Sequence, residues 1–423
     1  MESLRIPRLA LVSAVALVFA GYLLQALTPI RLSPDVATYL HMARTASEGS
    51  GFHRAGQRTY FPVGYPGMIA GLIKLHLAHP WSLVVLNVLW LMVAAAGCWV
   101  LFRRSFRFSA SASWLLVVVW LLSWPVAKHA AMALTDCSFL GAVMCALLAM
   151  DAGLEASSPR RAAWLAVVAA VFVAAGLSFR TAGVALLPAL FLTSFRYWRR
   201  SQLDRRWRLP AVMMTFAVLG TLAVGLPLMG MYSVSAYSEA AVTRPGTVLD
   251  RVLFHALEMG SVATNLPSSV LGHLLPGFVT NAIGFSLALL VAAGFWARRR
   301  FQPADVFLLC YSALLVQWPY YEPRLLIPAL PLFAAYGWSF VRTVKLRRFR
   351  VAMAGYLVLF IASGLLSLSY SIWLGSLRGA RFAQAYGGGS EGNNYCAAFG
   401  DCPIDPSRPP AKPAYVDVLR FYR

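Results

Sequence analysis

The feature that most constrains this fold is a succession of apolar runs, each long enough to cross a membrane. A helix rises 1.5 Å per residue, so a run of about 17 to 25 apolar residues spans the hydrocarbon core. Such runs cover residues 9–29, 80–102, 110–127, 136–154, 162–179, 181–197, 209–232, 275–297, 304–319, 325–341 and 351–373. Because 59% of the 423 residues are hydrophobic and only 13% are charged, one water-soluble core could not bury this apolar surface. We predict an all-α polytopic membrane protein with about eleven transmembrane helices.

Basic residues form short clusters between the apolar runs. If the runs alternate in direction, the clusters all fall on one side, which the positive-inside rule assigns to the cytoplasm. These clusters are Arg5/Arg8, Arg103/Arg104/Arg107, Arg160/Arg161, the arginines within 196–208, Arg298/Arg299/Arg300, and the basic residues within 342–350. The net charge of +21 therefore indicates cytoplasmic loops, and nucleic acid is not an expected partner.

The same alternation predicts a cytoplasmic N-terminus and an extracytoplasmic C-terminus. The composition, with much more arginine than lysine and abundant alanine, glycine and leucine, is typical of a GC-rich bacterium. We expect a multi-pass protein of a bacterial inner (plasma) membrane.

Most polar sequence outside the basic loops is expected on the extracytoplasmic face. There we place two long loops, 28–80 and 233–274, and a tail, 374–423, which follows a transmembrane domain of residues 1–373. Loops of this length are functional or disordered. The working face is therefore predicted to be extracytoplasmic.

Asp35 is the first candidate functional residue. Ser33 suits a helix N-cap, Pro34 suits the first helical position, and Asp35 then lies in the first turn, where the helix dipole stabilises a carboxylate. Tyr39 lies four residues later on the same face of this short amphipathic helix. Asp35 is placed to act as a base toward a substrate hydroxyl, or it only begins a helix.

Asp136 is the second candidate. It begins the run at 136–154, on the same predicted face as Asp35. With Thr135 it could equally be an N-cap residue. Two outward carboxylates in a chain with few acidic residues favour a shared site.

Cationic partners on this face are few. Arg180 ends one run, Arg324 opens another after Glu322, and Lys128 and His129 precede Asp136. The arginine fork suits phosphate oxygens. The alternative is that these arginines reach lipid headgroups or pair with a neighbour such as Glu322.

The cysteines and short motifs exclude several classes of protein. Cys396 and Cys402 lie in the outer tail, where an oxidising compartment would allow a disulfide, and no histidine spacing nearby favours a metal pair. The chain has no Walker loop, dinucleotide-type glycine pattern or His-Glu-x-x-His. An ATP-driven pump and a zinc protease of the common kinds are not supported.

Several motifs in order resemble a known family. They are Asp35-x-x-x-Tyr39, Phe61-Pro62-Val63-Gly64-Tyr65-Pro66, Thr135-Asp136, Phe179-Arg180-Thr181-Ala182-Gly183, and Pro323-Arg324-Leu325-Leu326-Ile327-Pro328. This order resembles the GT-C glycosyltransferases, most closely the bacterial relatives of protein O-mannosyltransferases and lipid A aminoarabinose transferases. The resemblance covers roughly the first 340 residues.

The resemblance implies inverting transfer of a sugar from a polyprenyl-phosphate donor to a glycan, lipid or protein acceptor at the outer face. Asp35 would be the general base, Arg180 and Arg324 would neutralise the leaving phosphate, and Asp136 would orient the acceptor, support Asp35 or help hold a metal. Tyr39, Tyr65, Lys128, His129 and Glu322 are the further expected substrate-binding residues. No cofactor is expected, and the outer carboxylates are too sparse to support a divalent metal.

Two alternatives belong to other classes. A transporter or flippase of lipid-linked glycans would show an inverted repeat and charged or broken helices near the membrane midplane. We find no such repeat in the sequence. A membrane scaffold would have outer loops whose role does not depend on Asp35.

Overall fold

The computed structural model describes residues 8–54, 57–58, 61–229, 247–298, 300–318, 322–386, 391–400 and 402–422. The first half of the chain contains α1 (Arg8–Leu24), η1 (Gln25–Leu27), α2 (Pro34–Ser47), β1 (His53–Arg54), β2 (Gln57–Arg58), α3 (Gly64–Lys74), α4 (Pro80–Arg104), α5 (Ala110–Leu121), α6 (Trp124–His129), α7 (Asp136–Leu154), α8 (Pro159–Phe179), η2 (Thr181–Ala185), α9 (Leu186–Leu203), η3 (Arg205–Trp207) and α10 (Arg208–Met229). The second half contains α12 (Val248–Thr264), α13 (Ser268–Leu274), α14 (Gly277–Arg298), α15 (Pro303–Gln317), η4 (Pro323–Ala329), α16 (Leu330–Thr343), α17 (Arg347–Ser376), α18 (Gly379–Tyr386), α19 (Gly392–Phe399) and α20 (Pro413–Phe421).

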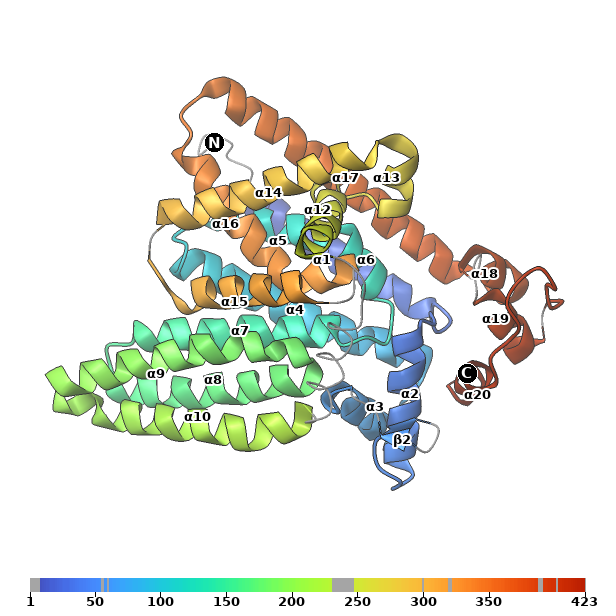
Figure 1. Cartoon of the computed structure of the whole chain (residues 1–423), viewed down its shortest axis with the longest axis horizontal. Coiled ribbons are helices and arrows are strands. Elements are labelled where there is room, and N and C mark those ends of the chain that lie inside the picture. Colours follow the sequence, from blue (N-terminus) through green and yellow to red (C-terminus); the bar gives the residue numbers. More distant parts are fainter. Residues whose placement is uncertain are drawn as a thin grey trace.

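The all-α prediction agrees with this architecture. In the described part of the chain, the strands are one antiparallel pair of two residues each. Figure 1 shows α7, α8, α9 and α10 side by side, with α2 running across their ends. Helix α7 is the most enclosed span, since 83% of its apolar window is buried, whereas α17 is 17% buried and presents most of its surface outward. The bundle is therefore organised around α7.

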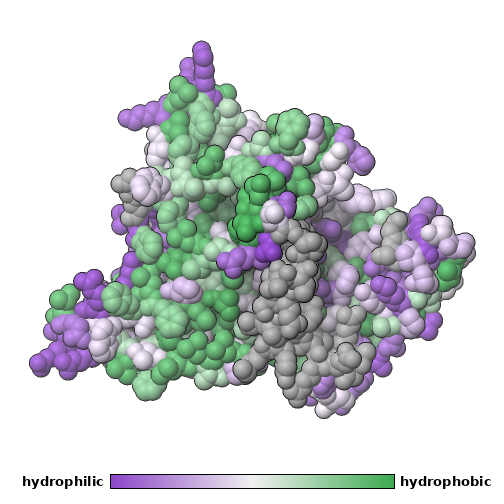
Figure 2. Space-filling view, in the orientation of Figure 1, coloured by the Kyte–Doolittle hydropathy of each residue, from purple (hydrophilic) through white to green (hydrophobic). Residues whose placement is uncertain are grey.

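The surface has the polarity expected of a membrane protein. Figure 2 shows an apolar area over the α7–α10 bundle, with hydrophilic residues gathered at its left tip and over the C-terminal helices on the right. Large apolar side chains, including Phe285, Leu289 and Trp296, are exposed on α14. In water such exposure would be costly, so these faces are suited to hydrocarbon.

The predicted number of eleven spans is not confirmed. By length and apolarity, eight helices among the described residues can cross a membrane, and α5 and α15 are shorter apolar helices. Helix α9 has 18 residues, but its last two turns carry Arg196, Arg199 and Arg200. The prediction of eleven spans was based on apolar runs alone, so it included helices that are short, such as α5 and α15, and one whose end is polar, α9.

One predicted span, 110–127, is divided in the structure. Helix α5 ends at Leu121, and α6 begins at Trp124, followed by Pro125, which has no backbone N–H to continue the helix. The side chain of Asn265 fills the break, because its Oδ1 accepts the Trp124 N–H at 2.6 Å and its Nδ2 donates to the Leu122 carbonyl at 3.0 Å. Because of this break, Trp124, Lys128 and His129 of α6 line a cavity.

The basic clusters gather at one end of the bundle, which we call the basic end. Arg104 pairs with Glu155 at 3.4 Å and so joins the ends of α4 and α7. Arg298 donates to the Ser105 carbonyl at 2.9 Å, which adds the end of α14. Arg196 donates to the Phe301 carbonyl at 2.6 Å, which adds α9. The predicted clusters around Arg104, Arg196 and Arg298 are therefore on one side in three dimensions, whereas the predicted Arg5 and Arg299 lie outside the described residues.

Reporter fusions test the orientation of these ends. We expect a fusion after Arg200, at the basic end, to report the cytoplasm, and a fusion after Leu377 to report the extracytoplasmic side. Paired fluorescent-protein and alkaline-phosphatase reporters measure this, because each is active on one side only. A phosphatase-active fusion at Arg200 would show that the orientation is reversed.

Candidate active site

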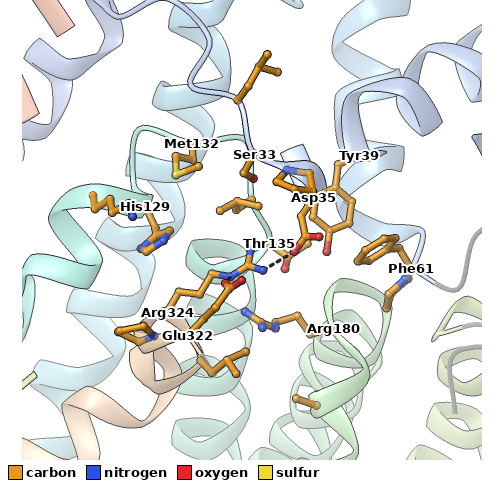
Figure 3. A pocket seen from close by; sticks show the side chains of 18 of the residues that line it. Ser33, Asp35, Tyr39, Phe61, His129, Met132, Thr135, Arg180, Glu322 and Arg324 are labelled. Atoms are coloured by element: carbon orange, nitrogen blue, oxygen red, sulfur yellow. Dashed lines mark hydrogen bonds and ion pairs between the residues drawn. The ribbon is translucent and has the colours of Figure 1, made fainter. Parts of the chain in front are cut away.

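A cavity of about 610 Å³ opens at the end of the bundle opposite the basic end. Its wall comes from the start of α2, from α6 and the segment before α7, from the α8–η2 junction, from η4 and from the C-terminal helices. Figure 3 shows the polar side chains converging on this space. The polar and aromatic residues of the wall include Asp35, Tyr39, Phe61, Lys128, His129, Thr135, Arg180, Thr181, Glu322, Arg324, Tyr386 and Glu391.

Asp35 reaches the cavity because α2 begins where the sequence predicted. Ser33 caps the helix by accepting the Val36 N–H at 3.3 Å, and Pro34 occupies the first turn. The Asp35 carboxylate forms an ion pair with the Arg324 guanidinium, and its side chain stays 25% exposed. A carboxylate that is both oriented and accessible can take a proton from a substrate.

Arg324 joins two carboxylates. Its Nη2 pairs with Asp35 and its Nε with Glu322, while its side chain is 14% exposed. The short helix η4 presents both Glu322, its N-cap, and Arg324 to the cavity. The guanidinium therefore fixes Asp35 and places positive charge on the cavity wall.

Asp136 and Arg180 form a second ion pair. Asp136 begins α7 and is 1% exposed, and it does not line the cavity, whereas Arg180 does. Among the described residues, Asp136 Oδ2 has no hydrogen-bond partner. The position of Asp136 behind Arg180 favours support of the site over direct contact with a substrate.

Two motif glycines allow this part of the wall to close. A Cβ on Gly64 would lie 2.7 Å from the Ser178 carbonyl oxygen, and a Cβ on Gly183 would lie 2.7 Å from the Gly176 carbonyl oxygen. Both contacts are with backbone, which cannot move aside as a flexible side chain can. Glycine at these positions lets α3 and η2 pack against the end of α8, which leads into Arg180.

Lys128 and His129 lie in α6 and differ in charge. His129 is buried, and its Nδ1 donates to the Pro125 carbonyl at 2.7 Å. Burial, and then the neighbouring Lys128 cation, lowers the pKa of His129 to about 3, so its imidazole is neutral near pH 7. Lys128 is exposed to the cavity and has no ion pair with the described residues, and the surrounding protein lowers its pKa by desolvation.

Aromatic rings form one side of the cavity. Tyr39 and Phe61 meet edge to face at 5.2 Å between ring centroids. Tyr65 packs against Tyr39 from behind, at 6.1 Å, and donates to Asn87 Oδ1 at 3.0 Å. Tyr65 was predicted to bind substrate, but the structure places it outside the cavity wall, in contact with Tyr39.

The C-terminal helices contribute to the wall, which the sequence reasoning missed. Tyr386 and Glu391 line the cavity, and Tyr386 donates to the Leu32 carbonyl at 2.8 Å. Tyr395 donates to the Ile30 carbonyl at 2.7 Å. A disulfide between Cys396 and Cys402, which the sequence analysis considered possible, joins α19 to the segment that follows it. The tyrosines Tyr386 and Tyr395, close in sequence to Cys396 and Cys402, could have indicated that this tail is folded.

Metal-binding geometry is absent from the described residues. No group of three or more His, Cys, Asp or Glu side chains lies close enough to hold an ion in that part of the chain. The cavity carboxylates Asp35 and Glu322 both pair with Arg324, so their oxygens already face a cation. The independence from a metal predicted from the sequence stays a prediction.

The fold is similar to that of ArnT from Cupriavidus metallidurans, solved bound to undecaprenyl phosphate. The TM-score is 0.55 at 14% sequence identity, and the match covers 85% of this chain and 76% of that chain. It is also similar to the oligosaccharyltransferase of Archaeoglobus fulgidus, solved tethered to an acceptor peptide. That TM-score is 0.51 at 13% identity, and the match covers 96% of this chain but 63% of the archaeal chain.

These likenesses define the fold of the chain. The chain has a GT-C-like fold, as the order of its motifs predicted. No protein-family model matches the sequence, and no curated protein matches it. Identities of 12–15% to the proteins with this fold establish the architecture alone, so the activity has to be argued from the site.

Proposed function

We propose that this protein is an inverting glycosyltransferase that moves a sugar from a polyprenyl-phosphate donor to an acceptor hydroxyl. The observation that carries the proposal is the carboxylate of Asp35, held by the first turn of α2 and by Arg324, in the same cavity as Arg180, Arg324 and Lys128. Transfer from a phosphate leaving group needs a base for the acceptor and cations for the departing charge. The structural likeness to ArnT bound to undecaprenyl phosphate supports the choice of donor.

Asp35 is the proposed general base. It removes the proton of the acceptor hydroxyl as that oxygen attacks the anomeric carbon from the side opposite the phosphate. The bond between the anomeric carbon and the phosphate oxygen breaks, and its electron pair stays on the phosphate. The products are the glycoside with inverted configuration, the polyprenyl phosphate and protonated Asp35.

The cations of the cavity are proposed to hold the lipid phosphate. Arg324 and Arg180 are already oriented by carboxylates, so little side-chain entropy is lost when phosphate binds. Lys128 is exposed to the cavity and supplies a further cation. Charge on the phosphate grows as the sugar leaves, and these fixed cations stabilise it more in the transition state than in the ground state.

Supplying several polyprenyl-phosphate sugars to the protein in liposomes tests the proposal. We expect one donor to be consumed, with polyprenyl phosphate released in proportion to the glycoside formed. Chromatography and mass spectrometry of both products provide the measurement. Movement of a labelled donor between leaflets without consumption would instead support the transporter alternative.

Lys128 gives the site a testable dependence on pH. Desolvation lowers the pKa of Lys128. The side chain is a charged ammonium below this pKa and loses its charge as pH rises through it, at a lower pH than an ordinary lysine does. We expect the donor KM to rise by about 10-fold or more on the alkaline side, since one charged contact to phosphate is lost. Lys128→Arg should move this rise to higher pH, because the guanidinium stays protonated.

The donor KM measured from pH 7 to 10 in the unmodified protein and in Lys128→Arg separates this effect from general inactivation. Lys128→Gln, which has no charge at any pH, should show a raised KM throughout. Matching alkaline limbs in the unmodified protein and Lys128→Arg would remove Lys128 from donor binding.

A further inference from the structure

A second cavity lies at the basic end, far from the candidate active site. It has a volume of about 420 Å³ and is formed by the α4–α5 connection and the C-terminal ends of α14 and α16. Four arginines line it, Arg107, Arg298, Arg300 and Arg342, and no carboxylate belongs to its described lining. The span Pro323–Thr343 runs from one cavity to the other, about 30 Å at 1.5 Å per residue. The two cavities therefore lie at opposite faces of a membrane.

Arg298 is the most informative of the four arginines. Its side chain is 7% exposed, and its guanidinium lies 3.7 Å from the centroid of the Phe106 ring. Its Nη2 donates to the Ser105 carbonyl at 2.9 Å and to Gln302 Oε1, and its Nη1 faces Asp305 at 3.5 Å, yet its Nε has no partner among the described residues. A buried charged donor without an acceptor is costly, and an anion in the cavity would supply one.

Two carboxylates interact with this guanidinium without neutralising the cavity. Asp305 is 3.5 Å from Arg298 Nη1, and it is buried with its oxygens already accepting from the Gln302 N–H and the Tyr336 hydroxyl. Asp151, which accepts from the Ser105 hydroxyl, is a second carboxylate that interacts with Arg298, and the two offset at most two of the four positive charges. The lining therefore keeps a net positive charge.

We propose that this cavity binds the phosphate group of an anionic membrane lipid. The guanidinium fork matches phosphate oxygens, and basic pockets between helices on the cytoplasmic side bind anionic headgroups. The size of the cavity suits a headgroup. Trp296 and Phe301, next in sequence to lining residues of the cavity, are 66% and 54% exposed and offer apolar contact to lipid chains. This surface favours a lipid over free phosphate as the source of the anion.

Native mass spectrometry of the purified, delipidated full chain tests the proposal. We expect phosphatidylglycerol to bind more tightly than phosphatidylcholine. The double variant Arg300→Gln/Arg342→Gln should weaken phosphatidylglycerol binding about 30-fold, because each arginine contributes about 1 kcal/mol to binding of an anionic headgroup. Both arginines are exposed, so their replacement should leave folding intact, unlike that of buried Arg298. Arg160→Gln/Arg161→Gln removes two exposed arginines at the basic end outside the cavity and should change nothing.

Equal affinities for the two lipids, or an equal loss in both double variants, would overturn the proposal. A titration with inorganic phosphate identifies the source of the anion. If inorganic phosphate binds and its binding requires Arg300 and Arg342, the site exists but its ligand is a free anion. If the lipid binds and inorganic phosphate does not, the ligand is a lipid whose headgroup and acyl chains are both recognised. The assay reads binding and not sugar transfer, so its result is independent of the proposed function.

Discussion

Replacing Asp35 with asparagine is expected to lower kcat for sugar transfer by 10²- to 10⁴-fold, the usual contribution of a general base. Asparagine has the same shape, and its side-chain oxygen can still accept a hydrogen bond from Arg324. It cannot take a proton from the acceptor. Transfer should therefore fail while the cavity, and binding of the donor, are kept.

Initial rates with the donor identified above, together with a thermal melt, measure this effect. Asp204→Asn is the matched control, because Asp204 is an exposed carboxylate beyond the end of α9, far from the cavity. It should transfer at the normal rate. If Asp35→Asn kept kcat within a few fold of the unmodified protein, Asp35 would not be the base.

His129 is another side chain of the cavity that could accept a proton, and its surroundings make it a weaker candidate than Asp35. Its side chain is buried, and its Nδ1 is already engaged with the Pro125 carbonyl at 2.7 Å, whereas the Asp35 carboxylate is 25% exposed to the cavity. A base has to come within hydrogen-bond reach of the acceptor hydroxyl, which favours Asp35. We therefore expect His129→Gln, which keeps a polar group of similar size, to affect transfer far less than Asp35→Asn.

The start of α2 could be predicted from sequence because it depends on local chemistry. Ser33, Pro34 and Asp35 are consecutive residues whose capping, dihedral and dipole preferences all favour the same helix end, and the structure has that end. The one-sided basic clusters were also predictable, because the rule behind them needs only the order of apolar runs and charges.

The remaining features of the site depend on contacts between distant residues. Tyr386 and the Leu32 carbonyl are 354 positions apart, and nothing in either segment alone indicates that they meet. Asp136 was predicted to face the site, but its pairing with Arg180 behind the wall depends on how α7 packs against α8. Helices α3 and α12 lie within segments that were assigned to loops, because short or interrupted amphipathic helices carry a weak hydropathy signal.

Arg324→Gln is expected to lower kcat/KM by about 10²- to 10³-fold, similar to the loss of one donor that stabilises a developing oxyanion. Glutamine removes the charge opposite the leaving phosphate and also breaks the link between Asp35 and Glu322. Arg324→Lys should recover part of the loss, because an ammonium keeps the charge but lacks the fork that joins two carboxylates. Arg381→Gln, at an exposed arginine of α18, is the control and should transfer normally.

Arg324 has two proposed tasks, orienting Asp35 and holding the lipid phosphate, and donor binding in the Asp35→Asn background separates them. The affinity for an unreacted polyprenyl-phosphate sugar is measured there with and without Arg324→Gln. If Arg324 holds the phosphate, the second substitution should weaken binding about tenfold or more even though Asp35 is already absent. If Arg324 only orients the base, the second substitution should leave the affinity unchanged, because the carboxylate that acts as the base has already been replaced. The second result would limit phosphate binding to Arg180 and Lys128.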